Sequence, residues 1–400
     1  MKILLINSVC GVGSTGRICS DIYDVATNTG HICKVAYGRG AAAKIPLSDT
    51  YRIGSDADVN IHALMSRITD RAGFYSKRAT LKFIDWIKDY NPDVIHMHNI
   101  HGYYINIEVL FNYLSNADKK VIWTLHDCWT FTGHCCHFDY VGCNRWKDGC
   151  GKCTQKRTYP ASYLADSSAR NYADKKKLFT SVSAMTLVTP SKWLADLVGQ
   201  SYLSNYDVKV IYNGIDTDVF KPTSSNFHKR HGLYNTKIVL GVASPWSERK
   251  GLGEFVKLSE KLSGDYTIVL VGVTEKQIKT LPKSFVCIKR TDSVIELAQI
   301  YSAADVFVNP TFEDNYPTVN VEALSCGTPL VTYSTGGSGE CLALTKNSGE
   351  IVPKGNVTAL VNVVMKNINR KETIKIDNAP FNKKTAYEEY LRAYEQLITK

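Results

Sequence analysis

The sequence has no long apolar run. No stretch of its 400 residues approaches the roughly 18 apolar residues that a membrane-spanning helix requires. The apolar stretch 3–6 stops at Asn7, which is too short for the hydrophobic region of a secretion signal, and no small-x-small cleavage site follows. We therefore expect a buried first strand and a cytoplasmic protein.

A basic run long enough to form a nucleic-acid-binding arm is also missing. The chain has 48 basic and 38 acidic residues, and its net charge of +10 is spread over both halves. Such a diffuse surplus fits an anionic substrate or an anionic membrane surface. With 44% hydrophobic and 22% charged residues, the composition is that of a globular chain and excludes disorder. We expect no nucleic-acid partner.

Short apolar runs alternate with amphipathic stretches of helical length. Continuous apolar strands are typical of parallel sheets buried on both faces, and their alternation with helices predicts βαβ units. Twelve such runs are too many for one sheet of ordinary size. The expected strands are 3–7, 33–37, 94–97, 121–125, 186–189, 208–212, 238–242, 267–272, 286–289, 306–309, 329–333 and 350–352.

A polar stretch divides these strands into two sets of six. Residues 216–237 are poor in apolar periodicity and are typical of a linker. We therefore expect an α/β protein of two Rossmann-like domains facing across a cleft. The expected parts are 1–220, 221–380 and an amphipathic C-terminal helix within 381–400 that could cap either domain. The alternative, an eight-stranded α/β barrel, needs about 250 residues and no linker in mid-chain.

Glycines follow the first expected strand, in the segment Gly11-Val12-Gly13-Ser14-Thr15-Gly16. In a Rossmann-like unit such glycines let backbone N–H groups approach a phosphate at a helix N-terminus. A dinucleotide site would also need an acidic residue at the end of the second strand, and 35–39 contains none. The pattern disfavours a nicotinamide dehydrogenase but still places Gly13 and Ser14 among candidate ligand-binding residues.

An acidic loop follows the expected strand 306–309 and precedes a helix that should begin near Pro317. Glu313 and Asp314 lie in the loop, and Glu322 lies inside the helix. A helix N-terminus attracts a phosphate, and carboxylates accept hydrogen bonds from sugar hydroxyls. The alternative is that the two loop acids only complement the helix dipole.

The segment 309–329 resembles the acidic donor-site motif of the retaining glycosyltransferases of family 4, which have the GT-B fold. That family usually has two glutamates with seven residues between them. Here Asp314 holds the first position with Glu313 beside it, and Glu322 matches the acid that binds the nucleotide ribose. Segments 187–194, 210–216, 241–251 and 301–308 are also similar, so the resemblance spans nearly the whole chain. Within the family it is closest to enzymes of exopolysaccharide and O-antigen assembly.

The resemblance implies further donor-site residues. Lys250 matches the lysine that contacts the donor diphosphate, and Arg249 could replace the usual arginine, whose position is taken by Pro245. Basic residues suit this place because a departing nucleoside diphosphate gains negative charge. His126, at the end of strand 121–125, matches the family's histidine beside the donor sugar. The implied catalytic residues are His126, Asp314 and Glu313, and the implied donor-binding residues are Arg249, Lys250, Glu322, Asn315, Gly13 and Ser14.

Six of the twelve cysteines lie in a loop at 128–153. Cys150 and Cys153 have the spacing of a zinc knuckle, and with Cys143 and Cys135 (or Cys136) they could hold a structural zinc ion. The alternative is that the cysteines pack as small apolar groups, reduced or in disulfides. No Asp-x-Asp motif stands at a strand end to hold a catalytic metal, so we expect no cofactor for catalysis.

These patterns together predict a glycosyltransferase of bacterial surface polysaccharide biosynthesis. The resemblance implies a UDP- or GDP-sugar donor, a saccharide acceptor, free or lipid-linked, and retention of configuration. Local basic excess within 67–88 and 145–157, with Phe74, Tyr75 and Trp146, suggests peripheral contact with the inner membrane face. The alternatives are a nucleotide-sugar epimerase of the same fold and a degenerate zinc-knuckle binding protein. His96, His98 and His101 could line the acceptor side or be ordinary polar lining.

Overall fold

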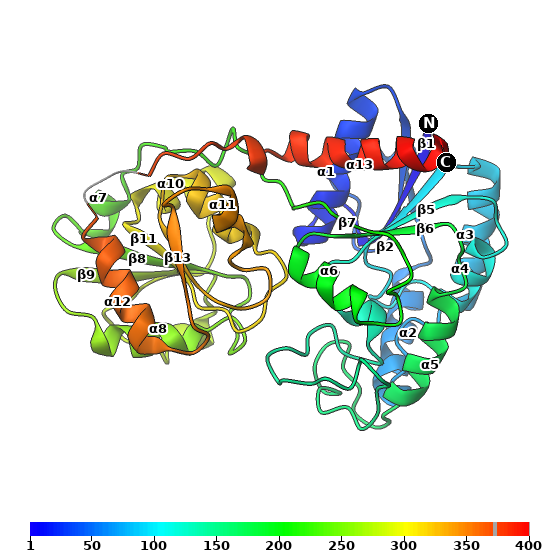
Figure 1. Ribbon diagram of the computed structural model, residues 1–400, viewed down its shortest axis with the longest axis horizontal. Helices are drawn as coiled ribbons and strands as arrows, with labels where there is room; N and C mark the ends of the chain where they lie inside the picture. Colours follow the sequence, from blue (N-terminus) through cyan, green and yellow to red (C-terminus); the bar gives the residue numbers. More distant parts are fainter. Residues whose placement is uncertain (371–373, 400) are drawn as a thin grey trace. The chain divides into compact units, whose positions relative to one another are not determined.

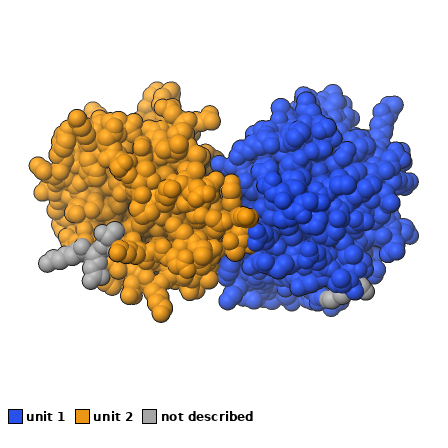
Figure 2. Space-filling model, turned by 90° about the horizontal axis from the view of Figure 1, so that it is seen from above, with its two compact units in different colours: residues 1–212, 386–400 blue, residues 213–385 orange. Residues whose placement is uncertain are grey.

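The computed structural model describes residues 1–370 and 374–399 and divides into two compact units (Figures 1 and 2). One unit contains residues 1–212 and the C-terminal residues from 386 onward, and the other contains residues 213–385. Each unit is built on one parallel sheet covered by helices, which confirms the expected α/β class. The division falls earlier than the boundary expected at residue 220.

The first unit has a seven-stranded parallel sheet in the order β3-β2-β1-β4-β5-β6-β7. Its central strands are almost fully buried, as their continuous apolar sequences predict. The strands are β1 (Lys2–Val9), β2 (Ile32–Arg39), β3 (Thr50–Arg52), β4 (Val94–Met97), β5 (Lys120–Thr124), β6 (Met185–Thr189) and β7 (Val208–Val210).

Helices cover both faces of this sheet because its side chains alternate between two cores. Leu4 and Ile6 of β1 pack with α3, α4, α5 and α6, whereas Ile3 and Leu5 pack with α1 and α13. Figure 1 shows α13 beside α1 on that second face. The helices are α1 (Gly13–Asn28), α2 (Asp56–Thr69), α3 (Lys77–Tyr90), α4 (Ile107–Leu114), α5 (Ser168–Phe179), α6 (Lys192–Gly199) and α13 (Lys383–Thr399).

The second unit has a six-stranded parallel sheet in the order β10-β9-β8-β11-β12-β13. Helices α8 and α12 cover one face, and α10 covers the other, where Tyr301 contacts Phe307 of β11. The strands are β8 (Lys237–Val242), β9 (Tyr266–Val271), β10 (Val286–Ile288), β11 (Val306–Asn309), β12 (Leu330–Tyr333) and β13 (Gly349–Val352). The helices are α7 (Phe227–His231), α8 (Leu252–Lys261), α9 (Glu275–Ile278), α10 (Val294–Ala303), α11 (Thr318–Ser325) and α12 (Val357–Ile368).

All twelve expected strands are present; two details differ from the expectation, and a third settles a point that the sequence left open. The edge strand β3 was not expected, so the sheets have seven and six strands instead of six each. The expected linker 216–237 contains the short helix α7. The C-terminal helix α13 packs on the first unit. No helix in the described part of the chain is long and apolar enough to cross a membrane.

Both sheets have a point at which the strand order reverses direction. It lies between β1 and β4 in the first unit and between β8 and β11 in the second. In open parallel sheets, ligands bind outside the carboxyl ends of the strands at such a point. Gly13, which begins α1, and His98 follow β1 and β4, and Lys250 and Asp314 follow β8 and β11, so these residues lie at the reversal points, whereas His126 follows β5, the next strand after β4.

Candidate functional site

In the second unit, the loops after β8 and β11 bring basic and acidic groups together. The two strands are hydrogen-bonded neighbours. Lys250 Nζ lies 2.5 Å from Asp314 Oδ2, and Arg249 Nη1 donates to the backbone oxygen of Glu313 at 2.5 Å. The structure therefore gathers four of the predicted residues at one sheet edge. Arg249 lies in this cluster, as expected of the residue that stands in for the arginine replaced by Pro245.

Backbone contacts hold these two loops together. Phe312 N donates to Arg249 O at 2.8 Å. Gly251, at the start of α8, has φ +78°, and a Cβ there would lie 2.1 Å from Pro310 O. Only glycine fits this close approach. The contact places the Lys250 side chain directly over the acidic loop.

The two loop acids have different surroundings. Glu313 is buried, with 1% of its surface exposed, whereas the Asp314 side chain retains 17% exposure beside Lys250. Asn315 N donates to Asp314 Oδ1 at 3.0 Å. Asp314 is thus more than a partner of the helix dipole, because it is ion-paired, and it is the more accessible of the two carboxylates.

Glu322 lies on α11, which begins one residue after Pro317 as expected. Its Oε2 accepts a hydrogen bond of 3.1 Å from Tyr301 of α10. The first turn of α11 has no side-chain cap and no acidic residue, so its N–H groups face the acidic loop without a competing carboxylate of their own helix. The arrangement can favour an anion at the helix start.

Sequence reasoning missed the loop after β12. Gly336 has φ +53°, and a Cβ there would lie 1.9 Å from Asp314 O; Gly337 N donates to the same oxygen at 3.2 Å. Thr335 Oγ1 donates to Phe312 O at 2.8 Å. This loop therefore supports the acidic loop from its other side. The pair Gly336-Gly337, which follows an apolar strand after two intervening residues, was the available signal.

In the first unit, His126 follows β5 as predicted and stacks on His98. His98 Nδ1 and His126 Nε2 are 3.0 Å apart, and the ring centroids are 5.3 Å apart. Burial lowers the pKa of His126 to about 4, although the charge of Asp127 acts in the opposite direction. His126 is therefore neutral near pH 7 and offers a polar ring nitrogen without a charge.

A buried polar group connects this histidine pair to the C-terminal helix. His96 Nδ1 lies 2.6 Å from the Tyr394 hydroxyl, and His96 Nε2 lies 2.8 Å from Thr124 Oγ1. The rings of His96 and His98 are 4.1 Å apart. Because both are buried, the suggestion that they line an acceptor surface is wrong; they support His126 from within the unit.

His101 belongs to a second polar group beside His126. Its Nε2 lies 3.0 Å from Asp127 Oδ2, and its Nδ1 lies 3.2 Å from the Tyr159 hydroxyl. Trp129 N donates to Asp127 Oδ1 at 2.9 Å. His101, Asp127 and Cys136 are close enough to one another to hold a metal ion. The carboxylate is already satisfied by these donors, so the group is explained as a polar network that fixes the segment after β5.

Gly13 and Ser14 lie where β1 turns into α1. Gly11 has φ +70° and approaches Ala43 O, whereas Gly13 has φ +66° and open space around its Cα. Asn7 joins this turn to the segment after β4, since its side chain accepts from Asn99 N at 3.2 Å and donates to Val9 O at 2.8 Å. The first unit thus has an exposed glycine turn at the sheet edge that also contains His98.

The structure changes the expected membrane surface. Trp146 is buried and cannot reach a headgroup layer. Arg71 pairs with Asp174 at 2.7 Å and stacks on Phe74 at 3.5 Å, so its charge is used within the unit. Trp146 and Arg71 therefore do not belong to the expected membrane surface.

The four cysteines Cys135, Cys143, Cys150 and Cys153 all border one small cavity in the first unit.

Comparison with known proteins gives concordant matches along the chain. Residues 41–219 match the family described as Glycosyltransferase Family 4, and residues 236–369 match Glycosyl transferases group 1. The putative colanic acid biosynthesis glycosyl transferase WcaC of Escherichia coli K12 is 24% identical over 99% of this chain and 100% of its own length. The capsular polysaccharide biosynthesis glycosyltransferase CapM of Staphylococcus aureus is 22% identical over 46% of this chain and 53% of its own.

Solved structures share the fold. A sucrose-phosphate synthase from Thermosynechococcus elongatus has a TM-score of 0.69 at 16% identity and covers 100% of this chain and 99% of its own. Anabaena Alr3699/HepE, solved in complex with UDP, has a TM-score of 0.62 at 16% identity over 100% of this chain and 97% of its own. At these identities the comparison establishes the architecture of the two sheets and their connections.

Proposed function

Because the chain belongs to family 4 of the glycosyltransferases and has the GT-B fold, we propose that it transfers a sugar, with retention of configuration, from a UDP- or GDP-sugar to a saccharide acceptor. We assign the reaction to the assembly of a bacterial surface polysaccharide. The names of the WcaC and CapM relatives, which refer to colanic acid and capsular polysaccharide, support this assignment. The acceptor is a saccharide, free or attached to a lipid.

The ion pair between Lys250 and Asp314 is the observation that carries the proposal. Lys250 and Arg249 lie at the carboxyl edge of β8 and β11, next to the uncapped start of α11. A nucleoside diphosphate gains negative charge as the glycosidic bond breaks, and fixed positive groups stabilise that charge most in the transition state. Lys250, Arg249 and the α11 amides fill this role.

The remaining residues divide between the nucleotide and the sugar. Glu322, oriented by the Tyr301 hydroxyl, accepts hydrogen bonds from the ribose. Asp314 and Asn315 contact the sugar hydroxyls, since Asp314 is the accessible loop acid. His126 meets the sugar near the reacting carbon as a neutral ring, and Gly13 and Ser14 contribute backbone groups to the donor.

In the proposed mechanism no carboxylate of the protein acts as the nucleophile. The acceptor hydroxyl attacks the anomeric carbon from the face that the diphosphate leaves. The departing phosphate oxygen takes the hydroxyl proton, so the products are the new glycoside and a protonated nucleoside diphosphate. Family 4 enzymes generally act without a metal ion, and we propose the same here, with Lys250 and Arg249 supplying the positive charge.

We place the enzyme at the cytoplasmic face of a membrane. The apolar side chains of Ile61 and Leu64 on α2 and of Leu81 on α3 are exposed. Helix α3 also carries the exposed cations Arg78 and Lys82. Apolar insertion combined with positive charge favours an anionic lipid surface. At this surface the enzyme would reach an acceptor that is anchored in the membrane by its lipid.

A donor screen with an acceptor control tests the proposed function. Thermal unfolding is followed with UDP, GDP and their sugars, since a ligand that binds the folded state raises Tm. We expect either the UDP compounds or the GDP compounds to raise the Tm of the wild type and to leave the Tm of Glu322→Ala unchanged. Donor turnover should then require added saccharide. Turnover without any acceptor would identify an epimerase instead, and no response to any nucleotide sugar would contradict the proposal.

A further inference from the structure

The segment between η2 (Trp129–Phe131) and α5 is long and irregular, yet it has a buried interior. Residues 132–167, all of which the structure describes, contain no helix or strand. Cys135, Phe138 and Trp146 are nevertheless 6%, 4% and 2% exposed. Loops of this length without secondary structure are uncommon in compact domains. These three side chains join the apolar core of the first unit, whereas the half-buried part of the segment, which carries Cys143, Cys150 and Cys153, has no secondary structure to hold it.

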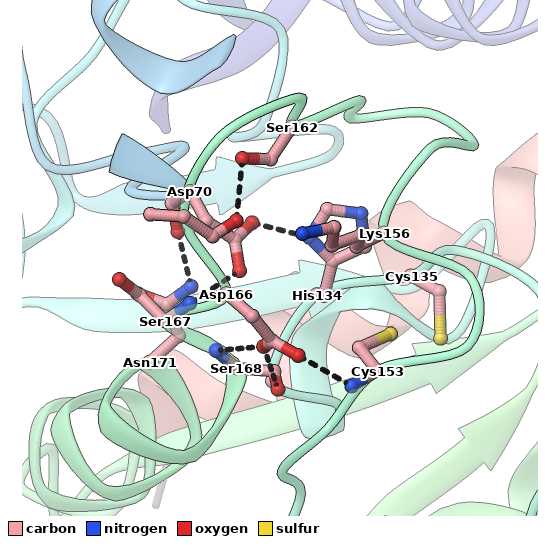
Figure 3. Close-up of polar contacts among 12 residues, drawn as sticks. Asp70, His134, Cys135, Cys153, Lys156, Ser162, Asp166, Ser167, Ser168 and Asn171 are labelled. Atoms are coloured by element: carbon pink, nitrogen blue, oxygen red, sulfur yellow. Dashed lines mark hydrogen bonds and ion pairs between the residues drawn. The ribbon is translucent and has the colours of Figure 1, made fainter. Parts of the chain in front are cut away.

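Four cysteines surround the centre of this segment. Cys135, Cys143, Cys150 and Cys153 border a single cavity of about 20 Å³ whose other walls include Phe138 and Trp146. The volume suits one ion or one water molecule. None of the four is in a disulfide. Figure 3 shows the side chains of Cys135 and Cys153 next to each other, with their sulfur atoms on the same side.

Two hydrogen-bond donors at the cavity are suited to charged sulfur. Gly133 N donates to Cys150 Sγ at 3.1 Å. Trp146 Nε1 is buried in the cavity wall with no hydrogen-bond partner among the described residues. Thiolates bound to a metal are stronger acceptors than thiols, so this orphaned donor gains a partner when the sulfurs are ligands.

The turn between Cys150 and Cys153 is held in a fixed shape. Arg145 Nη1 donates to Gly151 O at 2.6 Å and to Lys152 O at 2.5 Å. Lys152 has φ +48°, a conformation that reverses the chain between the two cysteines. Asp166 accepts from Cys153 N at 2.6 Å and from Ser168 N at 3.0 Å, which connects the turn to the start of α5 (Figure 3).

Charge also favours a metal with four thiolates. A zinc ion with four cysteine thiolates has a net charge of −2. The surrounding segment is basic: its charged residues between positions 145 and 157 are Asp148 alone among acids and Arg145, Lys147, Lys152, Lys156 and Arg157 among bases. Buried Lys175 lies next to the segment and donates to Thr132 O at 2.8 Å. This positive surplus offsets the charge of the metal centre.

We propose that Cys135, Cys143, Cys150 and Cys153 bind a structural zinc ion that holds the segment 132–167 in place. Among the described residues, no three of these four sulfur atoms all lie within 4.8 Å of one another, so binding must draw them inward to about 2.3 Å from the metal. His134 also borders the cavity, with Nδ1 bonded to Asp70 and a buried Nε2 that has no hydrogen-bond partner among the described residues; because four sulfurs already complete a tetrahedral set, we leave it outside the ligand set. The four thiol protons are released to solvent on binding.

Metal analysis of the purified full chain tests the proposal. We expect equimolar zinc by mass spectrometry of the wild type prepared under reducing conditions. Exchange for Co²⁺ should give the intense thiolate charge-transfer absorption and strong visible bands of a tetrahedral sulfur site. Neither readout depends on glycosyl transfer, so the test is independent of the proposed function. Absence of zinc together with failure of added Zn²⁺ or Co²⁺ to bind would overturn the proposal.

Variants identify the ligands. Cys143→Ser and Cys153→Ser should each lower zinc content severalfold, whereas Cys287→Ser in the second unit and His134→Asn should leave it unchanged. Loss of zinc in His134→Asn, or retention in both cysteine variants, would overturn the four-cysteine set. A Cys135–Cys153 disulfide found by mass spectrometry in metal-free wild type would do the same. The cobalt spectrum is measured on the wild type, so it tests the proposal even if a cysteine variant fails to fold.

Discussion

Lys250 Nζ lies 2.5 Å from Asp314 Oδ2, so two residues 64 positions apart in the chain form one ion pair at the edge of the second sheet. The pair holds the ammonium group before any ligand arrives. A cation that is already positioned needs little reorganisation when the diphosphate departs. In the enzyme without ligand, Asp314 also neutralises the charge of Lys250.

Replacement of Lys250 should therefore affect turnover more than stability. We expect Lys250→Met to lower kcat/KM by an amount equivalent to about 1.5–3 kcal/mol, the usual value for a lost charged hydrogen bond. Steady-state kinetics with the donor found in the screen measures this. Lys257→Met is the control, since Lys257 pairs with Glu254 of its own helix, α8, and its side chain is 58% exposed. Equal kinetics for Lys250→Met and the wild type would remove Lys250 from the site.

Replacement of Glu322 should weaken nucleotide binding. Calorimetric titration of Glu322→Ala with the nucleoside diphosphate should show a loss of about 1.5–3 kcal/mol, because the ribose loses a charged acceptor. Tyr301→Phe, which removes only the hydroxyl that orients the carboxylate, should cost less. Glu296→Ala on α10 is the matched control. Unchanged affinity in Glu322→Ala would end the ribose assignment.

Acid should destabilise the fold through its buried histidines. Burial lowers the pKa of His126 to about 4 and that of His96 to about 3, below the ordinary value of 6.5. As the pH falls below about 6.5, these histidines bind protons in the unfolded chain but remain neutral in the folded chain, so the free energy of unfolding decreases. The decrease ends near the folded-state values, and above pH 6.5 these groups contribute no slope.

Urea denaturation between pH 8 and pH 5 measures this effect. His126→Asn should reduce the slope, although His62, His96 and His98 retain their share, because burial also lowers their pKa values. A slope identical to that of the wild type would show that His126 is not buried in neutral form.

Removal of one hydroxyl on the C-terminal helix should destabilise the first unit. In Tyr394→Phe, His96 Nδ1 loses its partner at 2.6 Å while remaining buried, which costs about 1–3 kcal/mol. Thermal unfolding measures the loss, and Tyr163→Phe, whose ring is exposed, serves as the control. A Tm for Tyr394→Phe equal to that of this control would contradict the contact between α13 and His96.

Charge reversal on α3 tests the membrane surface. We expect wild-type protein to sediment with vesicles of anionic lipid at low salt and to be released by added salt, because surface charges are screened. Arg78→Glu combined with Lys82→Glu should abolish sedimentation, whereas Lys261→Glu combined with Lys276→Glu in the second unit should not. Absence of binding at low salt, or binding indifferent to both treatments, would remove this surface from the proposal.

The sequence predicts the sheets well because buried parallel strands leave a continuous apolar signature. Strand β3 escaped prediction because its three residues are only half-buried and pair along one edge. The acidic motif and Lys250 pointed to two loops that the structure brings together, and these are the loops to which we assign the donor. The support from Thr335 and Gly336 was not predictable, since it depends on the backbone oxygens of Phe312 and Asp314, which no side-chain pattern reveals. The contact of His96 with Tyr394 spans 298 positions, beyond the reach of any local pattern.

The position of α13 has a consequence for how the protein is made. The first unit is discontinuous in the chain, because residues from 386 onward complete a core begun by residues 1–212. Tyr387, Tyr390 and Tyr394 cover the sheet face formed by Ile3 and Leu5. On the ribosome these tyrosines emerge only after the entire second unit has been translated. Until then α1 alone covers this sheet face, so the first unit keeps part of an apolar surface exposed throughout the synthesis of the second unit, and that interval is the one most exposed to aggregation.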